Sequence, residues 1–574
     1  MNNQEAAQIF ENIADMLSIK GESVYRTLAY RKAAESIRSL GRDLGDIWRD
    51  GELKSIPGVG EAIASKIDEL YSNGEMVYYE KLKEEVPVGL VELLQVGDIG
   101  PKKAALFWHE MGITSLEALE RAAKEGRLRD LSGMGAKSEA RILESIESLK
   151  RRQTDRISIG EAWPAAEAFL NRLRELPQVA QAEAAGSLRR WRETVGDLDI
   201  LVGAKDAGAV MEAFLAFPEI ARVKGQGETK SSVELNNGLR VQVWVHPPDR
   251  FGSALQYATG SKDHNVLLRE LALKQGLSLS EHGYKREDGT EILCSEEAQV
   301  YETLGLPWIP PELREDRGEI EAALAGGLPD LIKLQDVQGE LHAHSDWSDG
   351  GASIEEMAAA AKQAGLKYLV ISDHSRSLGV ANGLSIERLH EQRSEIARVQ
   401  ESLGTTFRLL QGAEVEILAD GTLDYPDEVL AELDVVTASL HTSLRQSRKK
   451  VTERLLNAIR NPNVDIIGHP TGRLIGSRDP ADLDMEAVFA AAAQHGVVLE
   501  INAHPDRLDL KDVHARRAVE VGCQLAINTD AHQPDHFGLR VYGIATARRA
   551  WVTPANVLNT VSAKALLARL AKRG

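Results

Sequence analysis

The spacing of hydrophobic and polar residues changes twice along this chain. From residue 1 to about 154, apolar residues recur every three or four positions between short glycine turns, which predicts one helix after another. From about 155, apolar and polar residues alternate in runs such as 195–202, 232–235 and 239–245, which predicts strands. After 337, apolar strands alternate with helical segments, as in parallel β/α folds. We therefore expect a multidomain chain with an all-α part, an α+β part and a β/α part, in that order.

Length and composition are those of several ordinary folded domains. A chain of 574 residues is too long for one hydrophobic core, and its 43% hydrophobic and 27% charged residues are usual for globular proteins. The first residues lack a basic segment followed by an apolar one, and no stretch is long and apolar enough to cross a bilayer, so we expect a cytoplasmic protein. Cys294 and Cys523 form no C-x-x-C pattern and are predicted to be buried or reduced thiols.

The net charge of −19 argues against a uniformly basic surface for nucleic acid. The distribution of charge matters more than the sum, because a chain with several carboxylate metal sites is acidic until its cations bind. Any affinity for DNA is then expected to be modest and to depend on metal and salt.

Metal-ligand residues follow the predicted strands of the last segment. Six apolar runs end in His, Asp or Glu, and in a closed β/α barrel the carboxyl ends of the strands converge on one mouth. The candidate ligands are His342, His344, Asp349, His374, Glu414, His441, His469, Asp530 and His532. The i,i+2 spacing of His342 with His344, and of Asp530 with His532, puts each pair on one face of a strand.

This set of donors predicts a cluster of two or three metal ions, since nine candidates exceed the needs of one. Imidazole and carboxylate without thiolate suit Zn, Mn or Fe and disfavour Ca or Mg alone. Such a cluster lowers the pKa of bound water and clamps a phosphate. Any single histidine could instead be a core or surface residue, but ligands at six strand ends are not expected by chance. His504 and His514 lack this register and are taken as structural, whereas Arg473 and Arg376 are either phosphate clamps or solvated charges.

Three segments of the helical part share a helix, a glycine turn and a second helix, at 56–64, 96–104 and 131–140. In a helix-hairpin-helix, the glycines let the turn approach a DNA backbone, and N–H groups of the next helix bind phosphate whatever the base sequence. The predicted DNA-binding glycines are Gly58, Gly60, Gly97, Gly100, Gly133 and Gly135. Asp98 replaces a glycine usual in this motif, which leaves phosphate binding by the second copy open.

A glycine-serine pair and two alternating carboxylates lie within 185–200. Gly186 and Ser187 are predicted to form a tight turn that cradles a triphosphate. Asp197 and Asp199 alternate along a strand, so both carboxylates face one side, as two Mg²⁺ ions need to align a 3′-hydroxyl against an α-phosphate. The alternative is a pair of exposed strand aspartates, but the two motifs at this spacing are together specific for nucleotidyltransferases.

On these motifs, residues 1 to 318 resemble family X DNA polymerases and residues 337 to 574 resemble the PHP (polymerase and histidinol phosphatase) family. The resemblance implies a helical lyase-like domain with the first hairpin motif (1–80), a fingers-like helical domain with the other two (81–154), a nucleotidyltransferase palm (155–250), a thumb (251–318), a linker (319–336) and a distorted (β/α)7 PHP barrel (337–574). It also implies a trinuclear centre in the barrel that hydrolyses phosphoesters. The whole layout is similar to that of bacterial family X polymerases.

The resemblance also implies roles for single residues. Lys66 falls at the family's deoxyribose-phosphate lyase nucleophile, where an amine can form a Schiff base with an abasic sugar. Arg26, Tyr30 and Lys54 match parts of the 5′-phosphate pocket, but Ala62 stands where a lysine is expected. The implied catalytic residues of the palm are Asp197 and Asp199; the implied nucleotide-binding residues are Gly186, Ser187, Arg190, Gly196, Tyr257, Gly260, Asn265 and Arg269; Arg240 is an implied DNA contact.

One departure from the family affects the palm. The third catalytic carboxylate, expected within 239–244, is Gln242 in this chain. An aspartate would ligate the catalytic metal and help to deprotonate the 3′-hydroxyl, and an amide does neither well. Polymerisation is therefore expected to be slow, manganese-dependent or absent. Our hypothesis is that Glu234, across the hairpin turn 236–238 and on the same face as Gln242, partly substitutes for it.

Together these features predict a DNA-repair enzyme that joins template-directed gap filling to a Mn²⁺-dependent 3′–5′ exonuclease. The expected cofactors are Mg²⁺ or Mn²⁺ in the palm and two or three Mn²⁺ or Zn²⁺ ions in the barrel. The expected partners are gapped or nicked DNA with 3′ ends and dNTPs, without a membrane, and the chain is expected to be a monomer. One alternative is a DNA-end-binding module whose silent palm delivers DNA to the nuclease. Another is a barrel that hydrolyses a small ester such as histidinol phosphate, which fusion to DNA-binding motifs disfavours.

Overall fold

The computed structural model describes residues 3–38, 40–94, 96, 99–131, 134–151 and 156–570. The chain divides into two compact units, Met1–Asp155 and Arg156–Gly574. This division agrees with the boundary expected between the helical part and the palm.

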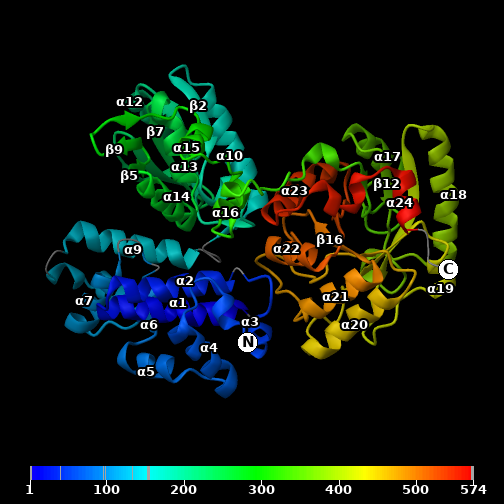
Figure 1. Ribbon diagram of the computed structural model, residues 1–574, viewed down its shortest axis with the longest axis horizontal. Helices are drawn as coiled ribbons and strands as arrows, with labels where there is room; N and C mark the ends of the chain where they lie inside the picture. Colours follow the sequence, from blue (N-terminus) through cyan, green and yellow to red (C-terminus); the bar gives the residue numbers. More distant parts are fainter. Residues whose placement is uncertain are drawn as a thin grey trace. The chain divides into compact units, whose positions relative to one another are not determined.

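The first unit is built from helices (Figure 1). They are α1 (Asn3–Lys20), α2 (Val24–Arg38), α3 (Leu44–Arg49), α4 (Glu61–Asn73), α5 (Val77–Glu85), α6 (Gly89–Leu93), α7 (Pro101–Met111), α8 (Leu116–Lys124) and α9 (Ala136–Arg151). Their apolar faces form a single core that includes Phe10, Leu70, Leu90 and Phe107. The expected domains 1–80 and 81–154 are therefore not separate bodies, because residues on both sides of position 80 share this core.

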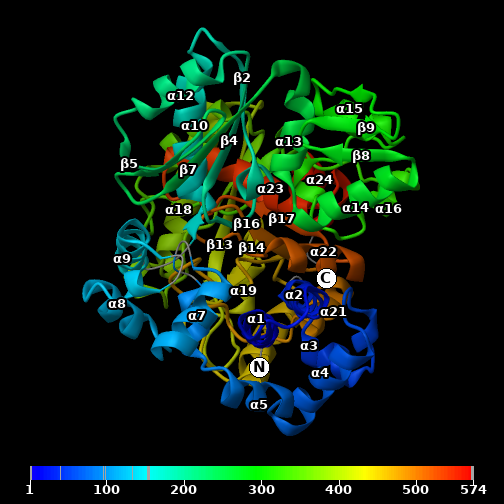
Figure 2. The ribbon, with the colours of Figure 1, turned by 90° about the vertical axis from the view of Figure 1, so that its left-hand side faces the viewer.

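The second unit begins with a mixed sheet in the order β2-β4-β7-β6-β5, onto which α10 and α12 pack (Figure 2). The elements are β1 (Ile157–Ser158), α10 (Ile159–Arg174), β2 (Val179–Ala184), α11 (Gly186–Arg189), β3 (Thr194–Val195), β4 (Leu198–Ala204), α12 (Ala207–Leu215), β5 (Ile220–Gln226), β6 (Lys230–Leu235) and β7 (Arg240–His246). Alternate residues of β7, namely Val241, Val243 and Val245, are buried, so the remaining positions, including Gln242, lie on the opposite face.

The single strand expected at 195–202 is in fact two strands. β3 pairs with β1, whereas β4 pairs with β2 and runs parallel to β7. The chain changes partner strands at Gly196 and Asp197, and Asp197 therefore precedes β4 rather than lying within it. The predicted hairpin at 236–238 is present, closed by the N–H of Leu235 bonding the carbonyl of Leu239 at 2.8 Å.

A small α+β layer follows the palm. It contains α13 (Phe251–Thr259), α14 (Lys262–Lys274), β8 (Leu277–Ser280), β9 (Gly283–Arg286), β10 (Glu291–Ile292), α15 (Glu297–Thr303) and α16 (Glu319–Leu324). Residues 319–336, expected as a linker, are packed instead, because Ile320, Ala323 and Leu331 join the core of this layer and Ile332 joins the core of the barrel. The buried Glu319 accepts from His264 Nδ1 at 2.7 Å and fixes this junction.

The last part is a seven-stranded parallel sheet in the order β11 to β17. Its elements are β11 (Gly339–Glu340), α17 (Ile354–Gln363), β12 (Tyr368–Ile371), α18 (Ile386–Leu403), β13 (Arg408–Glu416), α19 (Asp427–Leu430), β14 (Val435–Ser439), α20 (Arg448–Arg460), β15 (Ile466–Ile467), α21 (Met485–His495), β16 (Val498–Asn502), α22 (Asp512–Val521), β17 (Leu525–Asn528), α23 (Arg540–Arg549) and α24 (Ala563–Leu570). A parallel bridge between Ala343 and Ala531 joins the segments after the first and last strands, so the sheet nearly closes into a barrel. Helices such as α18, α20 and α21 surround it (Figure 1).

One of these strands, β16, was not predicted from the sequence. Its residues alternate between two cores: Leu499 and Ile501 pack outward with the helices, while Val498 joins Val370, Val435 and other strand residues in a separate inner cluster. The same arrangement explains why the barrel strands read as continuous apolar runs, since both of their faces are buried.

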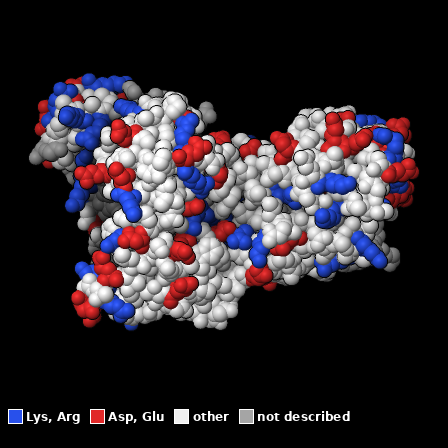
Figure 3. Space-filling view, turned by 90° about the horizontal axis from the view of Figure 1, so that it is seen from above, with Lys and Arg blue, Asp and Glu red and all other residues white. Residues whose placement is uncertain are grey.

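Acidic and basic side chains are interspersed on the face shown in Figure 3 rather than gathered into one field of either sign. Among the described residues, no helix combines the length and the apolar character that crossing a membrane requires. Cys294 and Cys523 are buried free thiols, as predicted.

Candidate active sites

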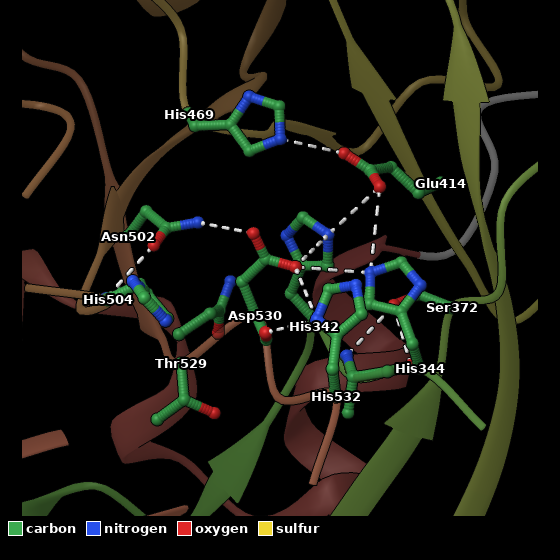
Figure 4. Close-up of polar contacts among 12 residues, drawn as sticks. His342, His344, Ser372, Glu414, His469, Asn502, His504, Thr529, Asp530 and His532 are labelled. Carbon is green, nitrogen blue, oxygen red and sulfur yellow. Dashed lines mark hydrogen bonds and ion pairs between the residues drawn. The ribbon is translucent and has the colours of Figure 1, made fainter. Parts of the chain in front are cut away.

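The nine candidate ligands of the barrel gather at the carboxyl ends of its strands. Figure 4 labels six of them, namely His342, His344, Glu414, His469, Asp530 and His532. All of them belong to overlapping groups whose donor atoms lie within 4.8 Å of one another. The groups are His344, Asp349, His374 and His532; His342, His344 and Asp530; His342, Glu414 and His469; and His374, Glu414 and His441. Glu414 is central, because its carboxylate lies 2.9 Å from both His374 Nδ1 and His469 Nε2.

The chemistry of these donors fits metal ions. Nε2 of His342, both nitrogens of His344 and His469, and both oxygens of Glu414 are buried and make no hydrogen bond among the described residues, although some of them face one another as ion-pair contacts. Buried polar atoms are rarely left in this state unless a ligand or ion satisfies them. His342, His344, His374 and Glu414 each belong to two groups, and this sharing is the arrangement that a cluster of neighbouring cations would need.

Two glutamates that the sequence analysis did not select orient these imidazoles. Glu500 lies 2.8 Å from His342 Nδ1, and Glu416 lies 2.7 Å from His441 Nδ1. Each contact fixes the ring so that Nε2 points into the cluster, as outer carboxylates do for metal-bound histidine. A signal was available for Glu500, because the apolar run 497–499 ends at this carboxylate, as other barrel strands end in His, Asp or Glu.

Electrostatics within the cluster are dominated by burial and mutual charge. Burial, together with His374 and His532, lowers the pKa of His344 to about 3, so that ring is neutral and free to ligate. Burial alone would lower the pKa of His374, but Glu414 and Asp349 outweigh it and raise the pKa to about 10. A cation that binds His374 must displace the proton on its ring, so the metal occupancy of the site should fall as the pH falls.

Neither arginine proposed as a phosphate clamp is free for that role. Arg473 donates to the carbonyls of Arg507 and Leu508 and to the carboxylate of Glu193 in the palm, the last at 2.7 Å. Arg376 donates to Asp424 through both its Nε and its Nη2. Arg473 is therefore a largely buried structural contact, whereas Arg376 pairs with Asp424 but keeps 53% of its side chain exposed.

The two histidines left as structural are not members of the ligand groups. The backbone N–H of His504 donates to Asn502, whose side chain reaches Asp530 (Figure 4). His514 packs edge-on against Phe489 with 6.2 Å between ring centroids.

In the palm, Asp197 precedes β4 and Asp199 is the second residue of that strand, near enough for their charges to interact. Gly186 is held against Asp199, since a Cβ at that position would lie 2.3 Å from Asp199 Oδ2. Burial, and then the charge of Asp197, raises the pKa of Asp199 to about 7. Gln242 is the register partner of Asp199 on β7, and its Nε2 donates to Asp197 Oδ2 at 2.7 Å. An amide donor thus occupies the place where a third carboxylate would face the metals.

Glu234 is further from this centre than our hypothesis assumed. Its register partner is Arg240, two residues before Gln242 on the same face of β7, and its carboxylate lies 2.8 Å from Lys224 Nζ. Ser232, not Glu234, is the register partner of Gln242.

Five of the eight implied nucleotide-binding residues lie around the end of α13, namely Arg190, Tyr257, Gly260, Asn265 and Arg269. Arg190 donates to the carbonyl of Thr259 at 2.6 Å, beside Gly260. Asn265 donates to the carbonyl of Tyr257 at 2.9 Å, and Arg269 donates to the carbonyl of Asn265. Ser187 lies in the first turn of α11, next to Gly186. Near the carboxylates, Arg240 donates to the carbonyl of Gly196 at 3.5 Å.

The three hairpin motifs share one backbone hydrogen bond among their described residues. The N–H of Val59, Ile99 and Met134 bonds the carbonyl three residues earlier at 3.0, 3.1 and 3.0 Å respectively. In each copy a glycine then precedes the second helix, namely Gly60 before α4, Gly100 before α7 and Gly135 before α9. Gly58 has φ of +78°, and a Cβ at this position would clash with the side chain of Lys32. Both facts explain why glycine is favoured there. Gly97, Asp98 and Gly133 lie outside the described residues.

Lys66 lies on α4 with its Nζ 5.0 Å from the centre of the Tyr78 ring. Burial, and then the charge of Arg26, lowers the pKa of its amine, which favours the nucleophilic form. Arg26 donates to the Tyr78 hydroxyl at 3.0 Å, and Tyr30 stacks on the same ring. Lys54 instead pairs with Glu61. Tyr78, which the sequence analysis did not select, is the side chain that connects this group.

Four family descriptions match segments of the chain. They are a helix-hairpin-helix domain at residues 1–76, a SAM-like helix-hairpin-helix tandem at 90–148, a DNA polymerase beta thumb at 254–315 and a PHP domain at 340–504. These ranges lie within the helical unit, the layer after the palm and the barrel, and the PHP match ends before β17 and the ligands Asp530 and His532.

Curated relatives cover the chain in whole and in part. The DNA polymerase/3′-5′ exonuclease PolX of Bacillus subtilis is 39% identical over 98% of both chains. DNA polymerase lambda of Rattus norvegicus is 27% identical over 54% of this chain and 56% of its own length. A probable phosphatase of a Thermoanaerobacter species is 31% identical over 38% of this chain and 89% of its own length. Because the first of these similarities extends over both halves, this chain belongs to the family X DNA polymerases of bacteria that carry a C-terminal PHP domain.

Proposed function

We propose that this protein is a DNA-repair enzyme that fills short gaps with its palm and removes 3′ nucleotides with its barrel. The observation that carries the proposal is the convergence of nine imidazole and carboxylate donors, six of them buried, in the same chain as a D-x-D palm and three hairpin motifs. A small-molecule phosphatase would have no use for the DNA-binding part.

In the barrel, the exonuclease reaction is the hydrolysis of the terminal phosphodiester. Water adds to phosphorus, the bond from phosphorus to the 3′-oxygen of the penultimate nucleotide breaks, that oxygen takes a proton, and a nucleoside 5′-monophosphate leaves. Mn²⁺ or Zn²⁺ held by the nine ligands would supply a nucleophilic water at neutral pH and neutralise charge on the phosphate. Glu500 and Glu416 keep His342 and His441 in the ligating orientation.

In the palm, Asp197 and Asp199 would hold the Mg²⁺ or Mn²⁺ that accompanies the incoming nucleotide, and Arg190 with Ser187 would bind its phosphates. Chain extension joins the 3′-oxygen to the α-phosphorus and releases pyrophosphate. The 3′-hydroxyl proton needs an acceptor in this reaction, and Gln242 cannot provide one.

The proposal is tested with the full chain on a one-nucleotide-gapped duplex labelled at the primer 5′ end. With Mn²⁺ and without dNTPs, we expect shortening from the 3′ end that His344→Ala abolishes and Asp199→Ala leaves intact. With dNTPs, we expect extension that Asp199→Ala abolishes and His344→Ala retains. Shortening that persists in His344→Ala would assign nuclease activity elsewhere, and repeating the assay with Mg²⁺ and Zn²⁺ identifies the metal.

A second candidate, a silent palm that delivers ends to the nuclease, is favoured by the hydrogen bond from Gln242 to Asp197. It predicts end binding without incorporation of any dNTP, even with Mn²⁺ in excess. Incorporation that depends on Asp199 would exclude it.

A further inference from the structure

One arginine beside the barrel cluster remains without a role. Arg507 lies on the loop between β16 and α22, and its Nε is 3.5 Å from Asp530 Oδ2, a carboxylate of the ligand groups. Its side chain is 18% exposed, so the guanidinium is at the mouth rather than in the bulk solvent. Its charge reaches the cluster, since it contributes, after burial, to the lowered pKa of His469.

The guanidinium has an unused donor. Nη1 of Arg507 is buried and makes no hydrogen bond to any described residue. A buried charged donor without an acceptor is unfavourable, so such a group is expected to meet an acceptor from a ligand. Because the guanidinium is cationic, an anionic oxygen is the acceptor that suits this donor best.

The loop that carries Arg507 is firmly held. The N–H of Arg507 and that of Leu508 both bond the carbonyl of His504, at 2.8 and 3.0 Å. Arg473 donates to the carbonyls of Arg507 and Leu508, and Leu508 is buried in the core cluster of the palm. Arg507 is therefore fixed before a substrate arrives, as a residue that stabilises developing charge needs to be. Its neighbours Arg473 and Arg478 donate to backbone carbonyls instead.

We propose that Arg507 binds a non-bridging oxygen of the scissile phosphate during hydrolysis in the barrel. The inference rests on the proposed nuclease function and names a catalytic residue for it. The guanidinium can donate in a fork to two phosphate oxygens, and this geometry also suits the phosphate of the released nucleoside monophosphate.

The test compares Arg507→Ala, Arg507→Lys and Arg478→Ala in the full chain with Mn²⁺ and a 3′-labelled oligonucleotide. Arg478 is the matched control, because it removes a nearby positive charge whose Nε bonds only the carbonyl of Gly472 among the described residues. We expect Arg507→Ala to lower kcat about 100-fold or more, the effect of removing one preorganised donor to developing charge, and Arg507→Lys to recover part of it. Arg478→Ala should retain wild-type kcat.

Two readouts besides activity separate this role from others. Mn²⁺ content and affinity, measured by metal analysis and calorimetry, should be unchanged in Arg507→Ala, whereas inhibition by added deoxynucleoside monophosphate should weaken by about tenfold or more, as for the loss of one charge-assisted contact. Loss of metal in Arg507→Ala, an equal fall of kcat in Arg478→Ala, or unchanged kcat and inhibition would each overturn the proposal. His344→Ala is run in parallel, and nuclease activity that survives in it would contradict the proposed function itself rather than the role of Arg507.

Discussion

Replacing Gln242 with aspartate should increase the rate at which the palm incorporates nucleotides. In the present structure any cation that binds Asp197 competes with the 2.7 Å hydrogen bond from Gln242 Nε2. A hydrogen bond to a charged group contributes about 1.5–3 kcal/mol, so this competition weakens cation binding roughly 10- to 150-fold. An aspartate at 242 would remove the donor and face the same side as Asp199, its register partner. As a general base it would add a factor of about 10² to 10⁴ in rate.

The assay is single-nucleotide incorporation on a gapped duplex, with His344→Ala in every protein so that the nuclease does not remove the product. We expect Gln242→Asp to raise kcat/KM at least about 100-fold and to lower the metal concentration at half-maximal rate at least about tenfold. Gln242→Asn is the matched control, because it has the length of aspartate without its charge.

Gln242→Asn and Gln242→Asp acting at the same rate would refute this reasoning, since the added carboxylate would then contribute nothing. Fast nucleotide incorporation by the palm with Gln242 unchanged would also refute this reasoning. Glu234 would then be the carboxylate to test as a substitute for the missing one. In that case Glu234→Gln should slow the reaction, and an unchanged rate would discard Glu234 as a substitute.

Further predictions concern the barrel, the helical unit and the metal-free palm. Glu500→Gln should weaken Mn²⁺ binding about 10- to 100-fold by calorimetry, because His342 loses the carboxylate that orients it; affinity equal to wild type would deny Glu500 this role. Lys66→Ala should lose the covalent adduct that borohydride traps with abasic-site DNA, while Lys54→Ala, whose lysine pairs with Glu61, should keep it. Asp199→Asn should stabilise the metal-free palm at pH 8 in thermal unfolding. The pKa of about 7, against an ordinary 3.8, means that ionising Asp199 disfavours the folded state as the pH rises between these values, so the gain should shrink to less than half at pH 5. A gain that does not change with pH would contradict this linkage.

Much of the molecule followed from the sequence because its signals are local. The period of apolar residues set the order of helical, mixed and β/α parts, and turn residues such as 236–238 located a hairpin. The ligand candidates were identifiable because parallel strands deliver their carboxyl ends to one mouth whatever the details of packing. Gln242 was recognisable as a departure because the resemblance to family X polymerases implies a carboxylate at that position.

Only the tertiary structure decided how residues distant in sequence use one another. Which of Arg473 and Arg507 can bind a ligand depends on the acceptors that surround each guanidinium. Arg473 donates to Glu193, which is 280 residues away in the sequence, whereas Nη1 of Arg507 makes no hydrogen bond to any described residue. The packing of 319–336 and the shared core of the first unit likewise depend on long-range burial, which periodicity does not report. The physical reason is the same in each case: a sequence shows which groups a chain carries, but partners across the fold determine which of those groups remain available for chemistry.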